Sequence, residues 1–406
     1  MRQFSLLIVL LFFAIAASAQ NKLTIDDAVK LAFENNIELQ KQSAELKRAD
    51  IEIGKSARLP NPTFSYSRED LEFGNLAYNE WIASGTMPLN FLWNRWSRIN
   101  SKEKAKDVEK LLYERLKTKI AADVRSEYYA ALLYDNLSSQ FESFLNHLDE
   151  LAAASMHRLD EGDISDYEYS RIIVEVNKIK SIVTEVELKK NQYFNNLSLL
   201  TGLNSDEKIE LMPIDYPLHI EVTLDQLKQT AIENRKDLLA HKTMIESEES
   251  ALSYNRMQII PEMSFTAGYK EQADNLTGTV FQFNVAVPLF ERNQAGIEES
   301  EIQLDLLDKE SIFLKEKIKR EVSEVYKRFI SKKNIYEKSK ENKLESIYTT
   351  ASYSYEQGEI PLVDFIDGMN AYVDGLILRT ELEIDVYSSL FSLEDAIGKE
   401  IINFEK

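Results

Sequence analysis

Two aspartates late in the chain have a side-chain type and a spacing that a binding site could use. Asp364 and Asp367 are three residues apart, which places both carboxylates on one face of a helix. Neighbouring carboxylates can attract and bind divalent cations. The corresponding positions of an earlier, related stretch hold Glu168 and Arg171, whose opposite charges could form ion pairs instead. Most aspartate pairs of this kind only solvate a helix surface, so the spacing alone defines no site.

A glycine lies a few residues before each of these charged pairs. Gly162-Asp163 and Gly358-Glu359 each follow a long stretch without glycine or proline, and each precedes an isoleucine. A glycine in this position usually supplies the left-handed residue that ends a helix. We therefore expect a tight turn between two helices at each glycine, with exposed acidic residues around it.

The other residues do not assemble a catalytic or metal site. None of the four histidines is spaced like a metal ligand from another histidine, and the chain has no cysteine. No phosphate-binding loop, nucleophile elbow or dinucleotide fingerprint is present. We therefore predict no enzymatic activity and no cofactor, and an exported enzyme is the least favoured class of function.

The sequence has the features of an exported, acidic protein with long helices. Residues 1–19 contain Arg2, an apolar run and the small residues Ala17-Ser18-Ala19, which predicts a cleaved signal peptide. No second apolar stretch is long enough for a membrane-spanning helix. A net charge of −20 in 406 residues argues against a nucleic-acid partner. Only 12 glycines and 8 prolines, with 29% charged residues, favour helices over a compact α/β enzyme.

An internal duplication organises the rest of the chain. Leu23-Thr24-Ile25-Asp26 opens one half, and Val222-Thr223-Leu224-Asp225 opens the other. Thr24 and Thr223 are predicted helix N-caps, and Gln226 has capping-box spacing from Thr223. We divide the mature chain into a first structural repeat, 20–221, and a second, 222–406.

Each half changes from helical to strand periodicity after a proline. Helices are predicted to end at Pro60 and at Pro261. Apolar and polar residues then alternate, as in Phe281-Gln282-Phe283-Asn284, which predicts one β-hairpin in each half. Loops are expected at Asp70–Asn79 and Gln272–Gly278. Aromatic residues near the strand ends are candidates for an interfacial girdle, namely Tyr66, Tyr78, Trp81, Trp93, Trp96 and Tyr269.

After each hairpin the chain returns to helix. Asn94–Arg158 and Glu298–Gln357 lack glycine and proline, which predicts two long unbroken helices. The helix after each glycine turn carries apolar residues in alternating steps of four and three. This spacing is typical of coiled-coil packing, although an ordinary antiparallel helical hairpin would have it too. With one gap in the first half, the residues are Ile172, Val176, Ile179, Val183, Val186, Tyr193, Leu197 and Leu200 there, and Leu362, Ile366, Met369, Val373 and Leu376 in the second.

Four strands are too few to close a sheet within a membrane. The open edges of a spanning sheet leave unpaired backbone groups in lipid, where each is costly. Closure therefore requires further copies of the chain. Two copies would supply eight strands and three would supply twelve, and the residues alone do not choose between them.

The order of these elements resembles the TolC-like family of outer-membrane efflux proteins. The likeness runs from about Leu23 to Gly398 and is carried by the duplicated opening, by the phrases 59–64 and 287–290, and by the repeated glycine turn. It implies a mainly α fold with β, in which long antiparallel helical hairpins form an α-barrel. Two β-hairpins per chain would contribute four strands to a homotrimeric, twelve-stranded transmembrane β-barrel. Asn61-Pro62 and the C-terminus are closer to the heavy-metal cation efflux branch.

The resemblance also implies a function and a location. The chain would be the outer-membrane channel subunit of a tripartite efflux system, a passive exit duct for metal cations or small toxic compounds in a Gram-negative bacterium. Its partners would be outer-membrane lipid, a periplasmic adaptor (membrane fusion) protein and an inner-membrane pump of the RND type. The resemblance puts Asp364, Asp367, Glu168 and Arg171 at the pore constriction, and Gly162, Asp163, Gly358 and Glu359 at tips that contact the adaptor.

Two other functions stay open at this point. The chain could be the exit duct of a type I secretion system. It could also be a periplasmic coiled-coil adaptor or scaffold, with its hairpins forming a small soluble sheet. An adaptor is expected to have one central helical hairpin flanked by β-rich modules, whereas this chain has two helical hairpins and two β-hairpins.

Overall fold

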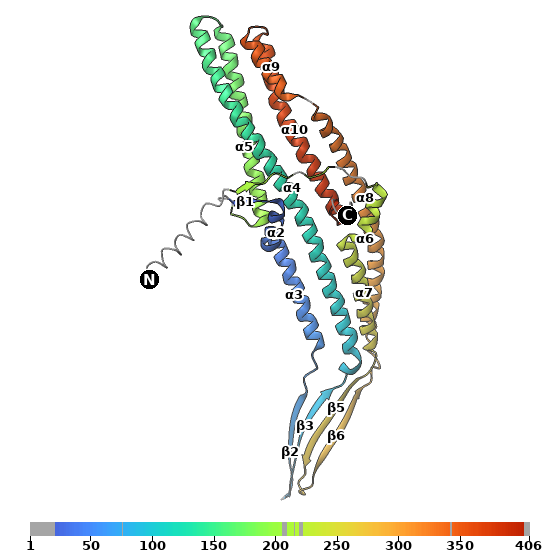
Figure 1. The fold of residues 1–406 in the computed structure, drawn as a ribbon. Coiled ribbons are helices and arrows are strands. Elements are labelled where there is room, and N and C mark those ends of the chain that lie inside the picture. The colour runs from blue at the N-terminus through green and yellow to red at the C-terminus, as the bar shows by residue number, and fades with distance from the viewer. Residues whose placement is uncertain are drawn as a thin grey trace, which may run out of the picture. The chain divides into compact units, whose positions relative to one another are not determined.

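Helices form most of the described structure (Figure 1). The structure, a computed structural model, describes residues 21–401 apart from 75, 205–208, 215, 219–221 and 342, so the predicted signal peptide lies outside it. Among the described residues, no helix is both long enough and apolar enough to cross a membrane. In chain order the elements are β1 (Asn21–Leu23), α2 (Ile25–Asn35), α3 (Ile37–Ala57), β2 (Thr63–Phe73), β3 (Leu76–Pro88), α4 (Phe91–Glu161), α5 (Asp166–Thr201), β4 (Ile209–Leu211), α6 (Leu224–Asn234), α7 (Lys236–Met257), β5 (Glu262–Glu271), β6 (Thr277–Ala286), α8 (Gln294–Ser339), α9 (Leu344–Glu356) and α10 (Leu362–Ile397).

The chain divides into two compact units, and each unit draws on both halves of the sequence. Unit 1 comprises the described residues within 1–40, 115–235 and 318–406, and unit 2 comprises those within 41–114 and 236–317. Unit 1 contains the helical hairpins that end in the glycine turns. Unit 2 contains a four-stranded sheet and the helical segments that lead into and out of it.

The core of unit 1 is built from α4, α5, α9 and α10. Ile179 and Val373 are fully buried, and they share one hydrophobic cluster with Phe141 and Phe365. Ten of the thirteen residues predicted from the four-three spacing on α5 and α10 belong to this cluster, and Tyr193 packs against it, whereas Leu197 and Leu200 lie outside it. The spacing therefore identified the packed faces of both helices correctly.

Helix starts fall where the capping residues predict them. Thr24 Oγ1 accepts a hydrogen bond from Asp27 N at 3.2 Å, ahead of α2. Thr223 and Gln226 form a complete capping box ahead of α6. Each cap satisfies backbone N–H groups that have no partner within the helix.

The second long helix is interrupted, so the prediction of an unbroken helix over Glu298–Gln357 is wrong. α8 ends at Ser339 and α9 begins at Leu344, whereas α4 runs without a break over Phe91–Glu161. Leu344 packs so closely on α10 that a Cβ on Gly375 would lie 2.5 Å from Leu344 Cδ2. No glycine or proline lies between Ser339 and Leu344, so the content of these residues does not predict the break. Tertiary context can override helix propensity in this way.

The sheet of unit 2 is antiparallel, in the order β2-β3-β5-β6 (Figure 1). Both predicted hairpins are present, and β3 pairs with β5 to join them. The first loop is shorter than the predicted Asp70–Asn79, because Leu71 pairs with Tyr78 and the two strands continue beyond this pair. Gly74, at φ +63°, supplies the left-handed residue that so tight a turn favours.

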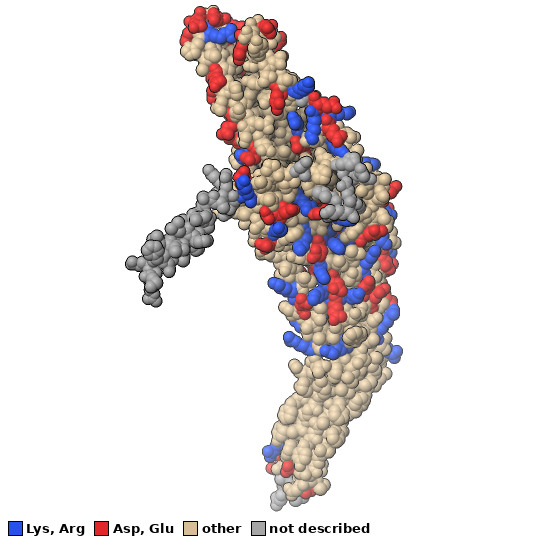
Figure 2. Space-filling model, in the orientation of Figure 1, with Lys and Arg blue, Asp and Glu red and all other residues tan. Residues whose placement is uncertain are grey.

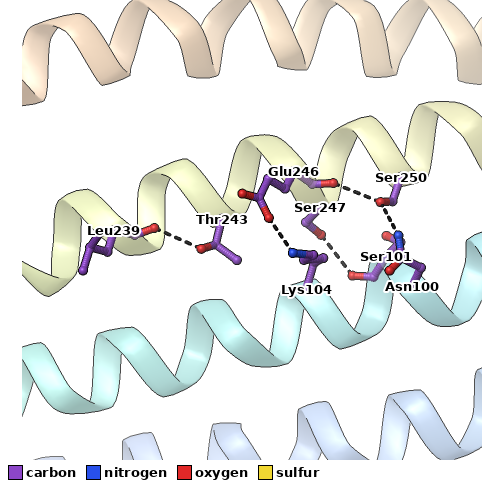
Figure 3. A network of polar contacts seen from close by, with 8 residues as sticks. All are labelled: Asn100, Ser101, Lys104, Leu239, Thr243, Glu246, Ser247 and Ser250. Carbon is purple, nitrogen blue, oxygen red and sulfur yellow. Dashed lines mark hydrogen bonds and ion pairs between the residues drawn. The ribbon is translucent and has the colours of Figure 1, made fainter.

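Polar contacts join α4 to α7 within unit 2 (Figure 3). Lys104 Nζ lies 2.5 Å from Glu246 Oε2, and Asn100 Nδ2 donates to Ser250 Oγ at 2.8 Å. α4 belongs to the first half of the sequence and α7 to the second. In unit 2 the two halves are therefore joined by contacts between helices as well as by pairing between strands.

Candidate functional site: hairpin tips and a two-faced sheet

The first hairpin tip is a glycine turn between α4 and α5. Gly162 has φ +81°, and its N–H donates to Leu159 O at 3.0 Å. Asp163 N donates to Arg158 O at 2.8 Å. These two bonds are those of a Schellman motif, which satisfies the last carbonyl groups of a helix. α5 then begins with a capping box between Ser165 and Glu168.

The second tip repeats this geometry between α9 and α10. Gly358 has φ +73°, and its N–H donates to Tyr355 O at 3.0 Å. Glu359 N donates to Ser354 O at 2.8 Å, matching the bond from Asp163. Pro361 precedes α10 and provides no side-chain cap. The two predicted glycine turns are therefore confirmed as turns, and the acidic residues that follow the glycines are exposed at both.

The glycine turns give a prediction for stability. Gly358→Ala is expected to lower the free energy of unfolding by about 1–2 kcal/mol, because a residue with a Cβ pays that cost in the left-handed region. Gly54→Ala is the matched control. A Cβ would meet nothing within 4 Å at either glycine, but Gly54 has ordinary helical geometry within α3. In thermal unfolding, Gly54→Ala should have a melting temperature at or above that of wild type, and Gly358→Ala a lower one. Equal melting temperatures for the two variants would contradict a cost of the left-handed conformation at Gly358.

Asp364 and Asp367 both lie exposed in the first turns of α10. Phe365 and Ile366, which lie between them in sequence, are buried in the core of unit 1. The helix therefore presents both carboxylates on its free face. Among the described residues neither carboxylate forms an ion pair. Whether three copies bring these carboxylates together is a proposal considered below.

Glu168 and Arg171 have different surroundings. The Glu168 carboxylate accepts hydrogen bonds from Ser165 N at 2.9 Å and Ser165 Oγ at 3.0 Å. The backbone hydrogen bond from Ser165 is the main cause that lowers the pKa of Glu168 below its ordinary value. Glu168 thus already acts in the cap of α5, a role that the Ser-x-x-Glu spacing indicates but that sequence reasoning missed. Arg171 forms no ion pair with the residues that the structure describes.

Aromatic and cationic side chains link the two hairpins of unit 1 below their tips. The Arg158 guanidinium lies over the Tyr355 ring, 5.7 Å from its centre. Tyr355 in turn stacks on Phe365, with ring centres 4.9 Å apart. A pocket of about 350 Å³ lies between α4 and α9 at this level, and these three residues are among its lining residues. Sequence reasoning did not identify this contact, because its members come from three different helices.

The sheet of unit 2 has one apolar and one polar face. Residue pairing places Phe64, Ala83, Phe265 and Phe281 on the same face, because side chains alternate along each strand. Phe64 and Phe281 are 76% and 69% exposed in the single chain, so this apolar face is uncovered. Tyr66, Trp81 and Tyr269 form a row across three strands of it. Their role in a girdle remains a prediction.

The opposite face is lined by small polar residues that contact one another across strands. Ser65 Oγ and Ser84 Oγ are 2.7 Å apart, and Thr86 Oγ1 and Thr266 Oγ1 are 2.8 Å apart. Asn284 Nδ2 donates to Ser264 Oγ at 3.2 Å. A sheet with an apolar face and a hydrated face suits a boundary between lipid and water. The side of the strand region that Figure 2 displays carries few charged residues except near its far end.

Comparison with solved structures identifies the fold. The chain is similar to a membrane protein from Pseudomonas aeruginosa, with a TM-score of 0.78 and 16% identity over 93% of this chain and 90% of that one. It is also similar to the CmeC outer-membrane channel of Campylobacter jejuni, with a TM-score of 0.75 and 14% identity over 92% and 85% of the two chains. The chain has the TolC-like channel fold, which confirms the predicted resemblance and the mainly α architecture with β-hairpins, whereas the trimeric twelve-stranded barrel stays a prediction.

Within this class a relative is also found by sequence. The cobalt-zinc-cadmium resistance protein CzcC of Cupriavidus metallidurans is 19% identical over 385 residues, which cover 94% of this chain and 91% of that protein. No protein-family model matches the chain. In the part of the chain that the structure describes, no three His, Cys, Asp or Glu side chains are grouped as metal ligands.

Proposed function

We propose that the chain is the outer-membrane subunit of a tripartite efflux system, where three copies form a passive exit duct. The observation that carries this proposal is the two-faced sheet with two free edges. β2 and β6 are the outer strands of the described sheet. An apolar face that is exposed in the single chain, opposite a polar face, is expected where a sheet separates lipid from water. In lipid the unpaired backbone groups of the two edges would have to pair with further strands.

Assembly of three copies follows from the need to close the sheet. In this proposal β6 of one copy pairs with β2 of the next, so that three copies supply twelve strands. The repeats 20–221 and 222–406 would then act as six similar wall segments, each bringing one β-hairpin and one helical hairpin. The test is the state of the full-length protein after export: recovery as a soluble periplasmic monomer would contradict the proposal.

The proposed partners are a periplasmic adaptor protein and an inner-membrane pump. The two tips, with Gly162 and Asp163 on one and Gly358 and Glu359 on the other, are exposed and closely similar in backbone geometry. Similar tips suit an adaptor that binds both in the same manner. Metal cations are the proposed cargo, because the relative CzcC is a cobalt-zinc-cadmium resistance protein and because acidic residues surround the tips.

The proposed pore constriction gives a conductance prediction. In a trimer, Asp364 and Asp367 would form two rings of carboxylates that attract divalent cations. The double variant Asp364→Asn, Asp367→Asn is expected to weaken block by divalent cations in single-channel recordings from planar bilayers. Asp305→Asn with Asp308→Asn is the matched control, since these exposed aspartates have the same spacing on α8. Unchanged block in the first variant would remove Asp364 and Asp367 from this role.

A further inference from the structure

A pocket of about 450 Å³ lies in unit 2 where the helices meet the sheet. Its walls come from the end of α3, from the turn between β3 and α4, and from the link between α7 and β5. Its polar lining includes Lys55, Arg58, Asn94, Arg98, Gln258 and Glu262. Figure 2 shows basic side chains gathered at this level, next to a strand region with few charges.

The lining of the pocket carries more positive than negative charge. Three cations face the single carboxylate of Glu262. Lys55 is engaged, because its Nζ lies 2.5 Å from Glu52 Oε1. The Arg58 guanidinium has no hydrogen-bond or ion-pair partner among the described residues, although Arg58 lies beside the pocket. A guanidinium offers five N–H donors in a planar fork, so Arg58 has unused capacity for an oxyanion.

Arg98 is held in place by the end of α3. Its Nε and Nη2 donate to Ser56 O at 3.2 and 2.6 Å, and Arg95 Nε donates to Ala57 O at 2.9 Å. These bonds satisfy carbonyl groups at the C-terminal end of the helix, which otherwise lack partners. Because Arg95 and Arg98 already fulfil this need, Arg58 is not required to cap α3.

The matching junction of the second half is closed by its own amide groups. Asn293 Nδ2 donates to Asn255 O at 3.0 Å, and Asn255 Nδ2 donates to Gly296 O at 3.0 Å. The two halves therefore use different side chains to bond the backbone groups where the helices meet the sheet. The second-half junction also holds arginines, but Arg292 Nε donates to Pro288 O at 3.2 Å and Arg256 Nη2 lies 2.9 Å from Glu301 Oε1. The Arg58 guanidinium differs from both, because it has no partner among the described residues.

The strand residues of the pocket belong to the polar face of the sheet. Pro88 and Glu262 each lie an even number of residues from Thr86 and Thr266, whose hydroxyl groups meet on that face. The pocket thus takes its strand residues from the polar face of the sheet. It is formed by one chain, so the inference does not depend on the proposed trimer.

We propose that this pocket binds an oxyanion of the phosphate type, with Arg58 as the principal contact and Arg98 as a second, preoriented one. Guanidinium groups recognise phosphate oxygens through paired, charge-assisted hydrogen bonds. The amide side chains of Asn94 and Gln258 add neutral donors to the same cavity. The anion is either free phosphate or the phosphate of a lipid headgroup, which have this chemistry in common.

The test is calorimetric titration of the purified full-length protein in detergent with sodium phosphate, against sodium chloride at equal ionic strength. Wild type is expected to bind phosphate saturably, and Arg58→Gln is expected to bind it at least about tenfold more weakly, as befits loss of a charge-assisted hydrogen bond. Arg48→Gln is the matched control, because Arg48 is exposed, as Arg58 is, but lies within α3 and pairs with Glu45 away from the pocket.

A second measurement separates the two sources of the anion. Native mass spectrometry after incubation with phosphatidylglycerol or phosphatidylcholine reports retained lipid. Retention of phosphatidylglycerol that is lost in Arg58→Gln and kept in Arg48→Gln supports the site with a headgroup as its ligand. If neither phosphate nor phosphatidylglycerol distinguishes Arg58→Gln from Arg48→Gln, the proposed site is overturned, whether or not the protein forms a channel.

Discussion

Arg125→Met is expected to lower the free energy of unfolding by about 3–5 kcal/mol, because it leaves a buried carboxylate without its cation. Glu394, on α10, is only 3% exposed, and its Oε2 lies 3.3 Å from Arg125 Nη1 on α4. Tyr216 Oη and Ile401 N donate to Glu394 Oε1 at 2.9 and 2.8 Å. Arg125 also contacts Glu400, which is partly exposed and can be hydrated when the arginine is removed.

Thermal unfolding of three variants separates the buried charge from other effects. Adding Glu394→Gln to Arg125→Met should recover most of the loss, since glutamine can still accept from Tyr216 and Ile401. Arg48→Gln, which breaks an exposed pair with Glu45, should have little effect. A loss in Arg125→Met no larger than in Arg48→Gln would show that Glu394 does not need its cation.

The same network gives a dependence on pH. Burial raises the pKa of Glu394 above its ordinary value, and Arg125 opposes this shift. Without Arg125 the folded state therefore favours the protonated carboxyl more strongly than the unfolded state does. Such a group stabilises the fold below its unfolded pKa and loses that stability as the pH rises through the folded pKa. The loss in free energy of unfolding that Arg125→Met causes should accordingly become smaller as the pH falls.

Phe281→Lys is expected to cost about 2–4 kcal/mol of stability in lipid, the usual cost of a lysine on the lipid face of a membrane strand near its centre. Phe281 lies on the apolar face of β6 and is 69% exposed in the single chain. Gln282→Lys, one residue further along, puts the same charge on the polar face and should be tolerated.

The measurement is denaturant unfolding of the protein reconstituted in lipid vesicles. Phe281→Ala serves as a second control, since it removes the ring and its stacking on Phe265 without adding charge. Equal losses for Phe281→Lys and Gln282→Lys would contradict the assignment of one face to lipid and the other to water.

Local periodicity was enough to predict the order of the two β-hairpins and of the helices around them, apart from the break between α8 and α9, together with the packed faces of α5 and α10. Apolar spacing on α5 and α10 identified buried residues, and strand alternation around Phe281 identified the two faces of the sheet. Glycine turns at Gly162 and Gly358 were also predictable, because a left-handed residue between two helices has a local signature.

Features that depend on contacts distant in sequence were missed. The break between α8 and α9 is accompanied by a close approach of Leu344 to Gly375, and no glycine or proline lies between Ser339 and Leu344 to indicate it. Arg125 and Glu394 are 269 residues apart, and no spacing rule relates them. The roles of Asp364 and Asp367 stay predictions for a similar reason, since a ring of carboxylates exists only between chains.

The pairing of β3 with β5 sets an order on the folding of the chain. Thr86 and Thr266, which meet across this joint, are 180 residues apart, whereas each hairpin closes over a short turn. The entropic cost of closing a loop grows with its length, so the hairpins form early and the joint forms late. Until the second half has been exported, the first hairpin exposes two strand edges and an apolar face, which are surfaces prone to aggregation. The duplicated chain is therefore most prone to aggregation while only its first half has been exported.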